Sequence, residues 1–151
     1  MHRHAEKRVL PHTVEQMFGV VADVEHYDDF LPWCTGVRVF RREEGMFLAD
    51  LMIGYKAIRE KFSSKVELFP HERIKVTYLT GPMRHLNNEW RFIPNADGTC
   101  TVDFLIEFEF RSRLLEKLIG GVFDEIVKRM VSAFVARADA LYCSEKRLHQ
   151  L

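Results

Sequence analysis

The chain has 151 residues, of which 47% are hydrophobic and 29% are charged. This is ordinary globular composition, and the length predicts a single domain, 1–151, with a hydrophobic core of its own. Basic and acidic residues balance at 22 each, so no overall field recruits nucleic acid or acidic lipid, and DNA binding is not expected.

The cysteines predict neither a disulfide framework nor a metal site. Cys34, Cys100 and Cys143 lie far apart, and the sequence has no Cys-x-x-Cys or Cys/His cluster. Reduced thiols in a cytoplasmic protein are therefore expected. No stretch approaches the roughly 20 apolar residues that span a bilayer. The N-terminus lacks the apolar run of a secretory signal.

The first third of the chain predicts a strand, a helix and a short apolar segment. Residues 5–10 are typical of a strand. The TVEQ sequence at 13–16 has the form of a capping box, and the apolar spacing after it predicts a helix to about Asp23. The segment YDDFLPWC at 27–34 is unusually rich in large apolar side chains, and we expect a helical turn and a bend at its proline. Such a segment is expected to cover hydrophobic surface.

Between Gly36 and Phe110 the hydrophobic period changes to two. Six strands are predicted, with the sequences VRVF, FLADLMI, AIREKFSSKVEL, RIKVTYL, NEWRFI and CTVDFLIEFEF. Asp97-Gly98 is a strong hairpin signal. Asn87-Asn88 is predicted as another hairpin turn, with amide donors to a ligand as the alternative. The last strand is apolar on one face and mostly acidic on the other, as in an antiparallel sheet that packs on one side only.

The C-terminal part predicts one long amphipathic helix, from about Arg113 to Tyr142, with apolar residues recurring every three or four positions. Gly120-Gly121 interrupts this pattern. The glycines indicate either close packing of the helix against the sheet or a kink that opens a way to the interior.

These elements predict an α+β fold in which a curved, six- to seven-stranded antiparallel sheet wraps around the long C-terminal helix. A strongly curved sheet does not fill its concavity easily against a straight helix. An apolar cavity lined by aromatic and aliphatic side chains is therefore expected between them.

Four segments carry a resemblance to a known family. They are VVADVEHYDDFLPWC at 20–34, GPMRHLNNEWRF at 81–92, VDFLIEFEFRSRLL at 102–115 and FDEIVKRMVSAFVARA at 123–138. With these segments in this order, the chain resembles the coenzyme Q-binding proteins of the START-like, or helix-grip, superfamily, which also contains polyketide aromatase/cyclases. Met83 is a departure, because the family often has phenylalanine after Gly-Pro. The exchange conserves volume and apolarity.

The resemblance implies a helix-grip fold that binds and delivers ubiquinone or a related polyprenyl quinone, in support of respiration and quinone biosynthesis. It implies no catalysis, no metal and no required cofactor, with the quinone as bound ligand. A cytoplasmic location with peripheral contact at the inner membrane is compatible with this role. The residues predicted to contact ligand are Pro32, Trp33, Leu86, Trp90, Phe104, Phe108, Phe123, Ile126 and Met130. Plain core packing is the alternative for these apolar residues.

Two other functions stay open at this point. The same branch contains a toxin-like protein that blocks ribosomal subunit association, which would need a basic surface patch. Candidate residues for that patch are Arg111, Arg113, Lys117, Lys128 and Arg129. A polyketide cyclase or dehydratase would need polar groups inside the cavity, and the predicted inward positions are nearly all apolar. The enzyme reading is therefore the least favoured.

Overall fold

The computed structural model describes residues 2–143, and Met1 and residues 144–151 of the predicted domain lie outside this range. Its strands are β1 (His2–Leu10), β2 (Cys34–Glu43), β3 (Met46–Tyr55), β4 (Ile58–Phe69), β5 (Arg73–Thr80), β6 (Met83–Pro94) and β7 (Cys100–Phe110). Its α-helices are α1 (Val14–Ala22), α2 (Tyr27–Phe30), α3 (Arg113–Ile119) and α4 (Phe123–Ala138). Short 3-10 turns at Val24–His26 and Gly120–Val122 and a π-helical turn at Asp139–Cys143 complete the described chain.

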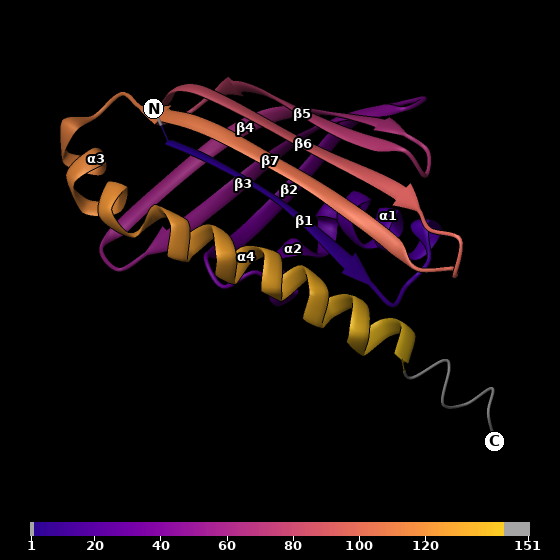
Figure 1. Ribbon diagram of the computed structural model, residues 1–151. Coiled ribbons are helices and arrows are strands. Elements are labelled where there is room, and N and C mark those ends of the chain that lie inside the picture. The colour runs from indigo at the N-terminus through magenta and orange to yellow at the C-terminus, as the bar shows by residue number, and fades with distance from the viewer. Residues whose placement is uncertain (1, 144–151) are drawn as a thin grey trace.

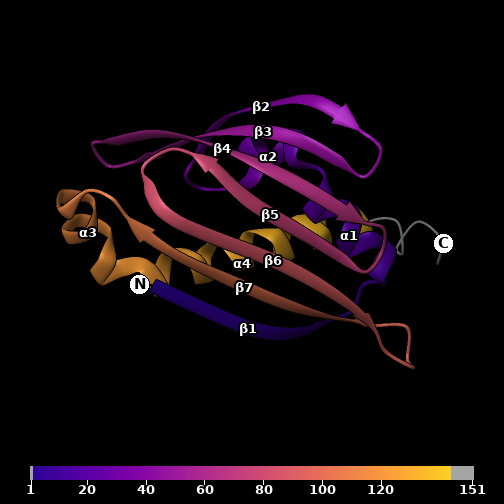
Figure 2. The ribbon, with the colours of Figure 1, turned by 90° about the horizontal axis from the view of Figure 1, so that it is seen from above.

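The seven strands form one antiparallel sheet in the order β1-β7-β6-β5-β4-β3-β2. The first strand therefore pairs with the last, and consecutive strands β2 to β7 are joined as hairpins. The sheet curves over α4, while α1 and α2 lie beside it on the same side (Figures 1 and 2). This arrangement confirms the predicted α+β helix-grip fold.

Local sequence signals account for the placement of α1 and of the β6–β7 hairpin. The backbone N–H of Gln16 donates to Thr13 Oγ1 at 3.1 Å, and the N–H of Thr13 donates to Gln16 Oε1 at 3.0 Å. This reciprocal pair is the predicted capping box. Gly98 adopts a φ of 86°, a conformation that L side chains rarely take, which confirms the predicted turn at Asp97-Gly98.

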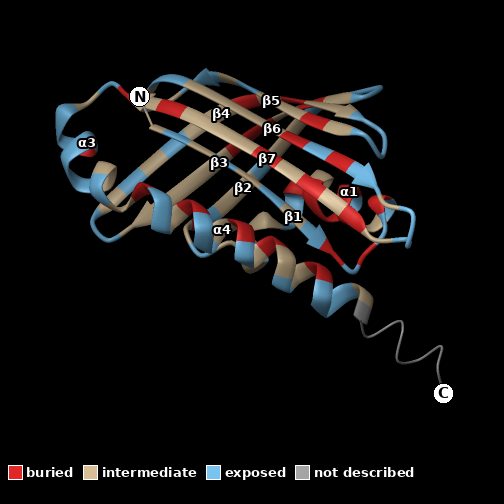
Figure 3. Ribbon diagram, in the orientation of Figure 1, coloured by how far each residue is buried: buried red, intermediate tan, exposed pale blue. Residues whose placement is uncertain are grey.

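The helix α4 buries one stripe against the sheet. Its buried residues recur every three or four positions: Phe123, Val127, Val131, Phe134 and Ala138. Figure 3 shows this stripe facing the sheet while the opposite side of α4 is exposed. Within the part of the chain that the structure describes, none of the helices combines the length and apolarity needed to cross a membrane.

The predicted C-terminal helix from 113 to 142 breaks at Gly120-Gly121, so of the two interpretations of these glycines the kink is confirmed. The chain forms α3, a 3-10 turn at Gly120–Val122 and then α4, and α3 departs from the axis of α4 (Figure 1). Glycine weakens a helix because its backbone is unrestricted, so two in succession allow this break. A Cβ added at Gly120 would lie 3.3 Å from His2 Cε1, so the junction also packs closely against the start of β1.

The predicted turn at Asn87-Asn88 is also wrong. Both residues lie within β6, paired with Glu107 and Ile106 of β7. The Asn88 side chain donates from Nδ2 to the carbonyl oxygen of Leu105 at 2.9 Å, which satisfies part of its amide inside the sheet. The turn before β6 falls at Gly81, where φ is 145°, so the glycine rather than the asparagine pair sets the hairpin.

Candidate functional site

A cavity of about 270 Å³ lies between the concave face of the sheet and the helices α3 and α4. The sheet contributes Cys34, Ala49, Leu51, Ile53, Tyr55, Ile58, Glu60, Phe62, Ser64, Val66, Ile74, Val76, Met83, Leu86, Asn88, Trp90, Ile106, Phe108 and Phe110. The helices and loops contribute Val24, Tyr27, Leu31, Trp33, Pro82, Leu115, Ile119, Phe123, Ile126, Val127, Met130 and Phe134. The lining is therefore almost wholly apolar.

Aromatic rings close the inner end of the cavity. The Trp90 ring, whose residue is 4% exposed, lies with its centroid 4.6 Å from that of Phe104 and 5.0 Å from that of Phe134. Phe134 also contacts the ring of Tyr27 at 5.2 Å between centroids. These edge-to-face contacts join β6, β7, α2 and α4, and they make this end rigid.

The opposite end of the cavity lies beside α3. Its lining comes from the tip of the β3–β4 hairpin (Tyr55 and Ile58), from the β5–β6 turn (Pro82) and from Ile119 of α3, all of them half-buried. The backbone N–H of Arg111 donates to the carbonyl oxygen of Pro82 at 3.1 Å, which fixes the start of α3 against that turn. This end of the cavity is therefore lined by half-buried side chains of two hairpins and of α3.

Few polar groups interrupt the lining. Ser64, which is 2% exposed, lies on β4 and Asn88 on β6, and Glu60 is the one carboxylate among the described residues of the lining. Within the described residues, no lysine, arginine or histidine lines the cavity. A hydroxyl and an amide can hydrogen-bond to an uncharged polar group, whereas an anionic head group would find no cation. The cavity therefore suits a neutral, largely apolar ligand.

The segment Tyr27–Cys34 supplies one wall of the cavity through Tyr27, Leu31, Trp33 and Cys34. The Tyr27 hydroxyl donates to the carbonyl oxygen of Val21, and burial raises the pKa of this phenol, which keeps it protonated. Burial also raises the pKa of the Cys34 thiol to about 11. The segment therefore covers the cavity, and the two ionisable side chains with which it lines the cavity, Tyr27 and Cys34, are neutral at physiological pH.

The raised pKa of Cys34 predicts a slow thiol. Because the thiolate is the nucleophile, alkylation of Cys34 by iodoacetamide should be slow at neutral pH in the folded protein and should accelerate only as the pH rises toward about 11. In urea-unfolded chain the same rise should occur near the ordinary thiol pKa of about 8.5. Peptide mapping of alkylation against pH measures both profiles. Coincident folded and unfolded profiles would contradict this prediction.

The structure places seven of the nine predicted ligand residues in the cavity lining. These are Trp33, Leu86, Trp90, Phe108, Phe123, Ile126 and Met130. Pro32 lies outside the lining and is exposed, because it forms the outer side of the bend between α2 and β2. Phe104 lies outside the lining; it is 1% exposed and packs edge-to-face against Trp90, its neighbour in register on β6. Contact of the seven residues with a ligand stays a prediction.

Sequence reasoning missed the contribution of β3 and β4. Along β4, the residues Ile58, Glu60, Phe62, Ser64 and Val66 all line the cavity. Their alternation is visible in the sequence, since every second residue of a strand faces the same side. Ser64 and Glu60 interrupt the apolar pattern, which hid this face. The alternation on β4 was therefore present in the sequence, but its two polar residues made the cavity face difficult to recognise.

A curved antiparallel sheet that holds a long helix across an apolar cavity defines the helix-grip class of START-like proteins. The family model described as "Polyketide cyclase / dehydrase and lipid transport" matches residues 10–135, and the chain belongs to this family.

Its curated relatives bear two kinds of name. The chain is 37% identical over 143 residues to coenzyme Q-binding protein COQ10 homolog B, mitochondrial, of Xenopus laevis; the match covers 92% of this chain but only 59% of that protein. It is 34% identical over 134 residues to the ribosome association toxin RatA of Escherichia coli K12, covering 89% of this chain and 85% of the toxin.

Solved structures share the fold. The 18 kDa protein CC1736 of Caulobacter crescentus has a TM-score of 0.75 and 38% identity, with 94% of this chain and 99% of that one covered. The Zhui aromatase/cyclase of Streptomyces has a TM-score of 0.80, covering 91% of this chain and 93% of that one, but only 17% identity. The second likeness extends to the fold alone.

Proposed function

We propose that this protein binds ubiquinone or a related polyprenyl quinone in its cavity and delivers it without chemical change. The observation that carries the proposal is the lining itself, which is apolar, contains a hydroxyl and an amide at Ser64 and Asn88, and holds no basic side chain among the described residues. A quinone is an uncharged ring with carbonyl acceptors on an apolar tail, and it matches these features. The name of the frog relative supports the same ligand class.

Burial of apolar surface would drive binding, at about 25 cal/mol per Å² removed from water. The Ser64 hydroxyl and the Asn88 amide can donate to ring carbonyls and so orient the head group. The cavity, at about 270 Å³, lies just below the roughly 300–1,000 Å³ typical of ligand sites. It would therefore enclose a ring with a short part of the tail, and the remaining isoprenoid would leave past α3.

A carrier fits the cavity better than an enzyme does. In the part of the chain that the structure describes, the lining holds one carboxylate, Glu60, and no histidine, so no acid–base pair faces the interior. The aromatase/cyclase structures are enzymes by name, but this chain shares only 17% identity with Zhui.

Ligand extraction tests the proposal. Protein purified from a quinone-producing host should release quinone into organic solvent, detected by mass spectrometry, in an amount that scales with protein. Delipidated protein should take up added ubiquinone and quench tryptophan fluorescence, because Trp90 and Trp33 line the cavity. Protein that is empty after purification and also fails to take up added quinone would overturn the proposal.

A second function has its own support. The Escherichia coli toxin is named for ribosome association, and the chain exposes Arg111, Arg113 and Lys117 near one end. Basic side chains on a surface bind phosphate backbones. Sucrose-gradient profiles after overexpression test this function: a loss of 70S ribosomes in favour of free subunits supports it, and an unchanged 70S peak excludes it.

A further inference from the structure

The helix α3 exposes apolar side chains at the end of the cavity. Leu114 is 66% exposed and Leu118 is 52% exposed, although both are large aliphatic residues. They lie four residues apart, so they share one face of the helix. Their neighbours Leu115 and Ile119 line the cavity. One short helix thus carries an outward apolar face directly beside an inward one.

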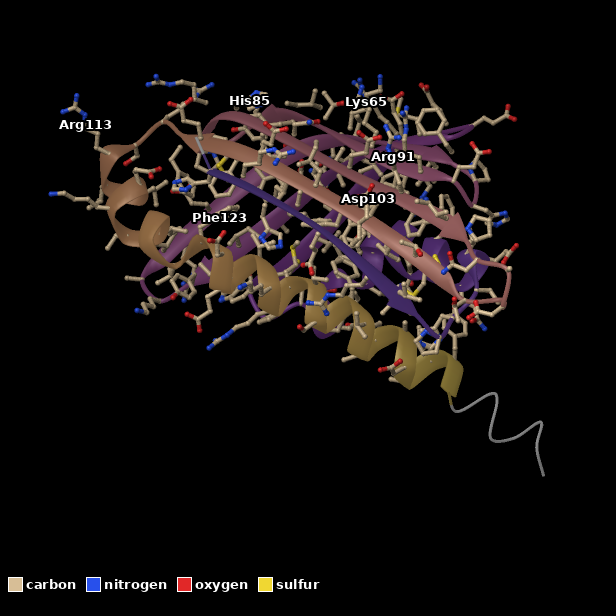
Figure 4. All side chains as sticks on the ribbon, viewed as in Figure 1. Lys65, His85, Arg91, Asp103, Arg113 and Phe123 are labelled. Carbon is tan, nitrogen blue, oxygen red and sulfur yellow. The ribbon has the colours of Figure 1, made fainter. Side chains whose placement is uncertain are left out.

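Exposed basic side chains lie on α3 and next to its start. Arg113 and Lys117 lie on α3 itself and are exposed, and Arg113 points away from the body of the protein in Figure 4. Arg111 is exposed just before the helix, and its Nε donates to the carbonyl oxygen of Met83 at 3.0 Å. Arg84, at the start of β6, is exposed beside it.

The β3–β4 hairpin adds two further exposed basic side chains at this end of the molecule. Lys56 and Arg59 are exposed, and they flank Tyr55 and Ile58, which line the same end of the cavity as α3. Figure 2 shows the tips of the β3–β4 and β5–β6 hairpins at the same end of the molecule as α3. The whole chain has no net charge, so this concentration of cations is local.

The one acidic residue of α3 does not neutralise the basic side chains near the exposed leucines. Glu116 Oε1 lies 2.5 Å from Nε2 of His2, so its carboxylate is turned toward β1. The His2 ring in turn contacts the rings of Phe108 and Phe123, with centroids 5.3 and 5.2 Å away. The next acids along the chain, Asp124 and Glu125, lie beyond the break at Gly120 on α4.

We propose that α3, together with the β3–β4 hairpin tip, docks on a bilayer that contains anionic lipid, with Leu114 and Leu118 inserted among the acyl chains. Exposed leucines accompanied by exposed cations on the same helix match a bilayer surface, which has anionic head groups outside and acyl chains beneath them. A phosphate backbone would use the cations but leave the leucines in water, so lipid is favoured over RNA. Docking would set the end of the cavity that α3 lines against the membrane. This inference rests on the proposed function, because it names the surface at which the quinone enters and leaves.

Vesicle sedimentation with the full chain tests the docking. The protein should sediment with vesicles of phosphatidylcholine mixed with phosphatidylglycerol and much less with phosphatidylcholine alone. The double variant L114S/L118S should lower the partition constant by about tenfold per leucine, since full burial of a leucine is worth at least that factor. The double variant R113Q/K117Q should lower it by about fivefold per charge and reduce the preference for anionic lipid.

Matched variants elsewhere provide the controls. V9S/I93S removes two other exposed apolar side chains, which are 66% and 43% exposed, and K65Q/R91Q removes two basic side chains from the outer face of the sheet (Figure 4). Both should bind vesicles as the natural protein does. Circular dichroism should show every variant folded, because none of the side chains removed is buried in the core.

Three outcomes would overturn the docking proposal. One is a natural protein that binds neither vesicle, and another is an L114S/L118S variant that binds like the control variants. The third is a vesicle-free dimer that L114S/L118S converts to monomer, which would make α3 a contact between copies of this chain. Uptake of detergent-solubilised ubiquinone by the same variants is measured in parallel. Normal uptake without vesicle binding would reject docking and leave quinone binding intact. Vesicle binding without uptake would support docking and reject quinone binding.

Discussion

Replacement of Val76 by phenylalanine is expected to lower the affinity for ubiquinone by tenfold or more while the protein stays folded. Val76 is half-buried on the concave face of β5, where it lines the cavity and pairs in register with Val66 and Asn88. Without ligand, the larger ring can occupy the empty cavity and bury its own surface. With ligand, ring and quinone compete for the same space. Overpacking of this kind costs about 1–3 kcal/mol, and 1.4 kcal/mol is tenfold in affinity.

The neighbouring position supplies the control for this variant. Thr77 is exposed on the outer face of the same strand, so Thr77→Phe adds a ring to β5 without entering the cavity. Isothermal titration or fluorescence quenching with a short-chain ubiquinone gives both affinities, and urea denaturation gives both free energies of unfolding. Unchanged affinity in Val76→Phe would show that quinone does not occupy this part of the cavity.

Replacement of Trp90 by alanine is expected to have the largest effect on stability, lowering the free energy of unfolding by about 3–5 kcal/mol. Trp90 is 4% exposed and contacts Phe104 and Phe134, so it joins the centre of the sheet to α4. Removal of the indole leaves a hole at the rigid end of the cavity that the surrounding rings cannot fill. Urea denaturation followed by circular dichroism measures the loss.

The other tryptophan is the comparison. Trp33 is half-buried, and its ring contact with Tyr55 is longer, at 6.2 Å between centroids. Trp33→Ala should therefore cost only about 1–2 kcal/mol. A similar loss for both variants would contradict the assignment of Trp90 to the core. Lower quinone content in Trp90→Ala alone would not demonstrate ligand contact, because the same change weakens the fold.

Particular segments show why the helices and strands could be predicted from the sequence. The alternation of β7, the capping box at Thr13 and the apolar stripe of α4 each depend on residues a few positions apart. Strand and helix periods fix which side chains share a face, whatever the rest of the chain does. The order of these elements then predicted a curved sheet around a helix. The resemblance to START-like proteins pointed to the same fold.

The residues that line the cavity could be predicted from the sequence only in part. Phe104 and Phe108 share one face of β7, and their spacing gives no reason to separate them. Phe104 packs against Trp90, its partner on β6, and lies outside the lining, whereas Phe108 lines the cavity. Similarly, Gly120-Gly121 indicated a weak point in the helix. It did not indicate that one face of α3 would line the cavity while the neighbouring face is exposed to solvent. Both outcomes depend on partners far away in the sequence.

The sequence by itself determined the strands, the helices and the apolar face of each, since these follow from the local period of the backbone. Only the tertiary structure decided which apolar residues meet one another and which border the cavity, and that α3 presents Leu114 and Leu118 to solvent. The physical reason is that a cavity is a property of how far a bent sheet stands from the helix it holds. That separation is set by many long-range contacts together, none of which has a local signature.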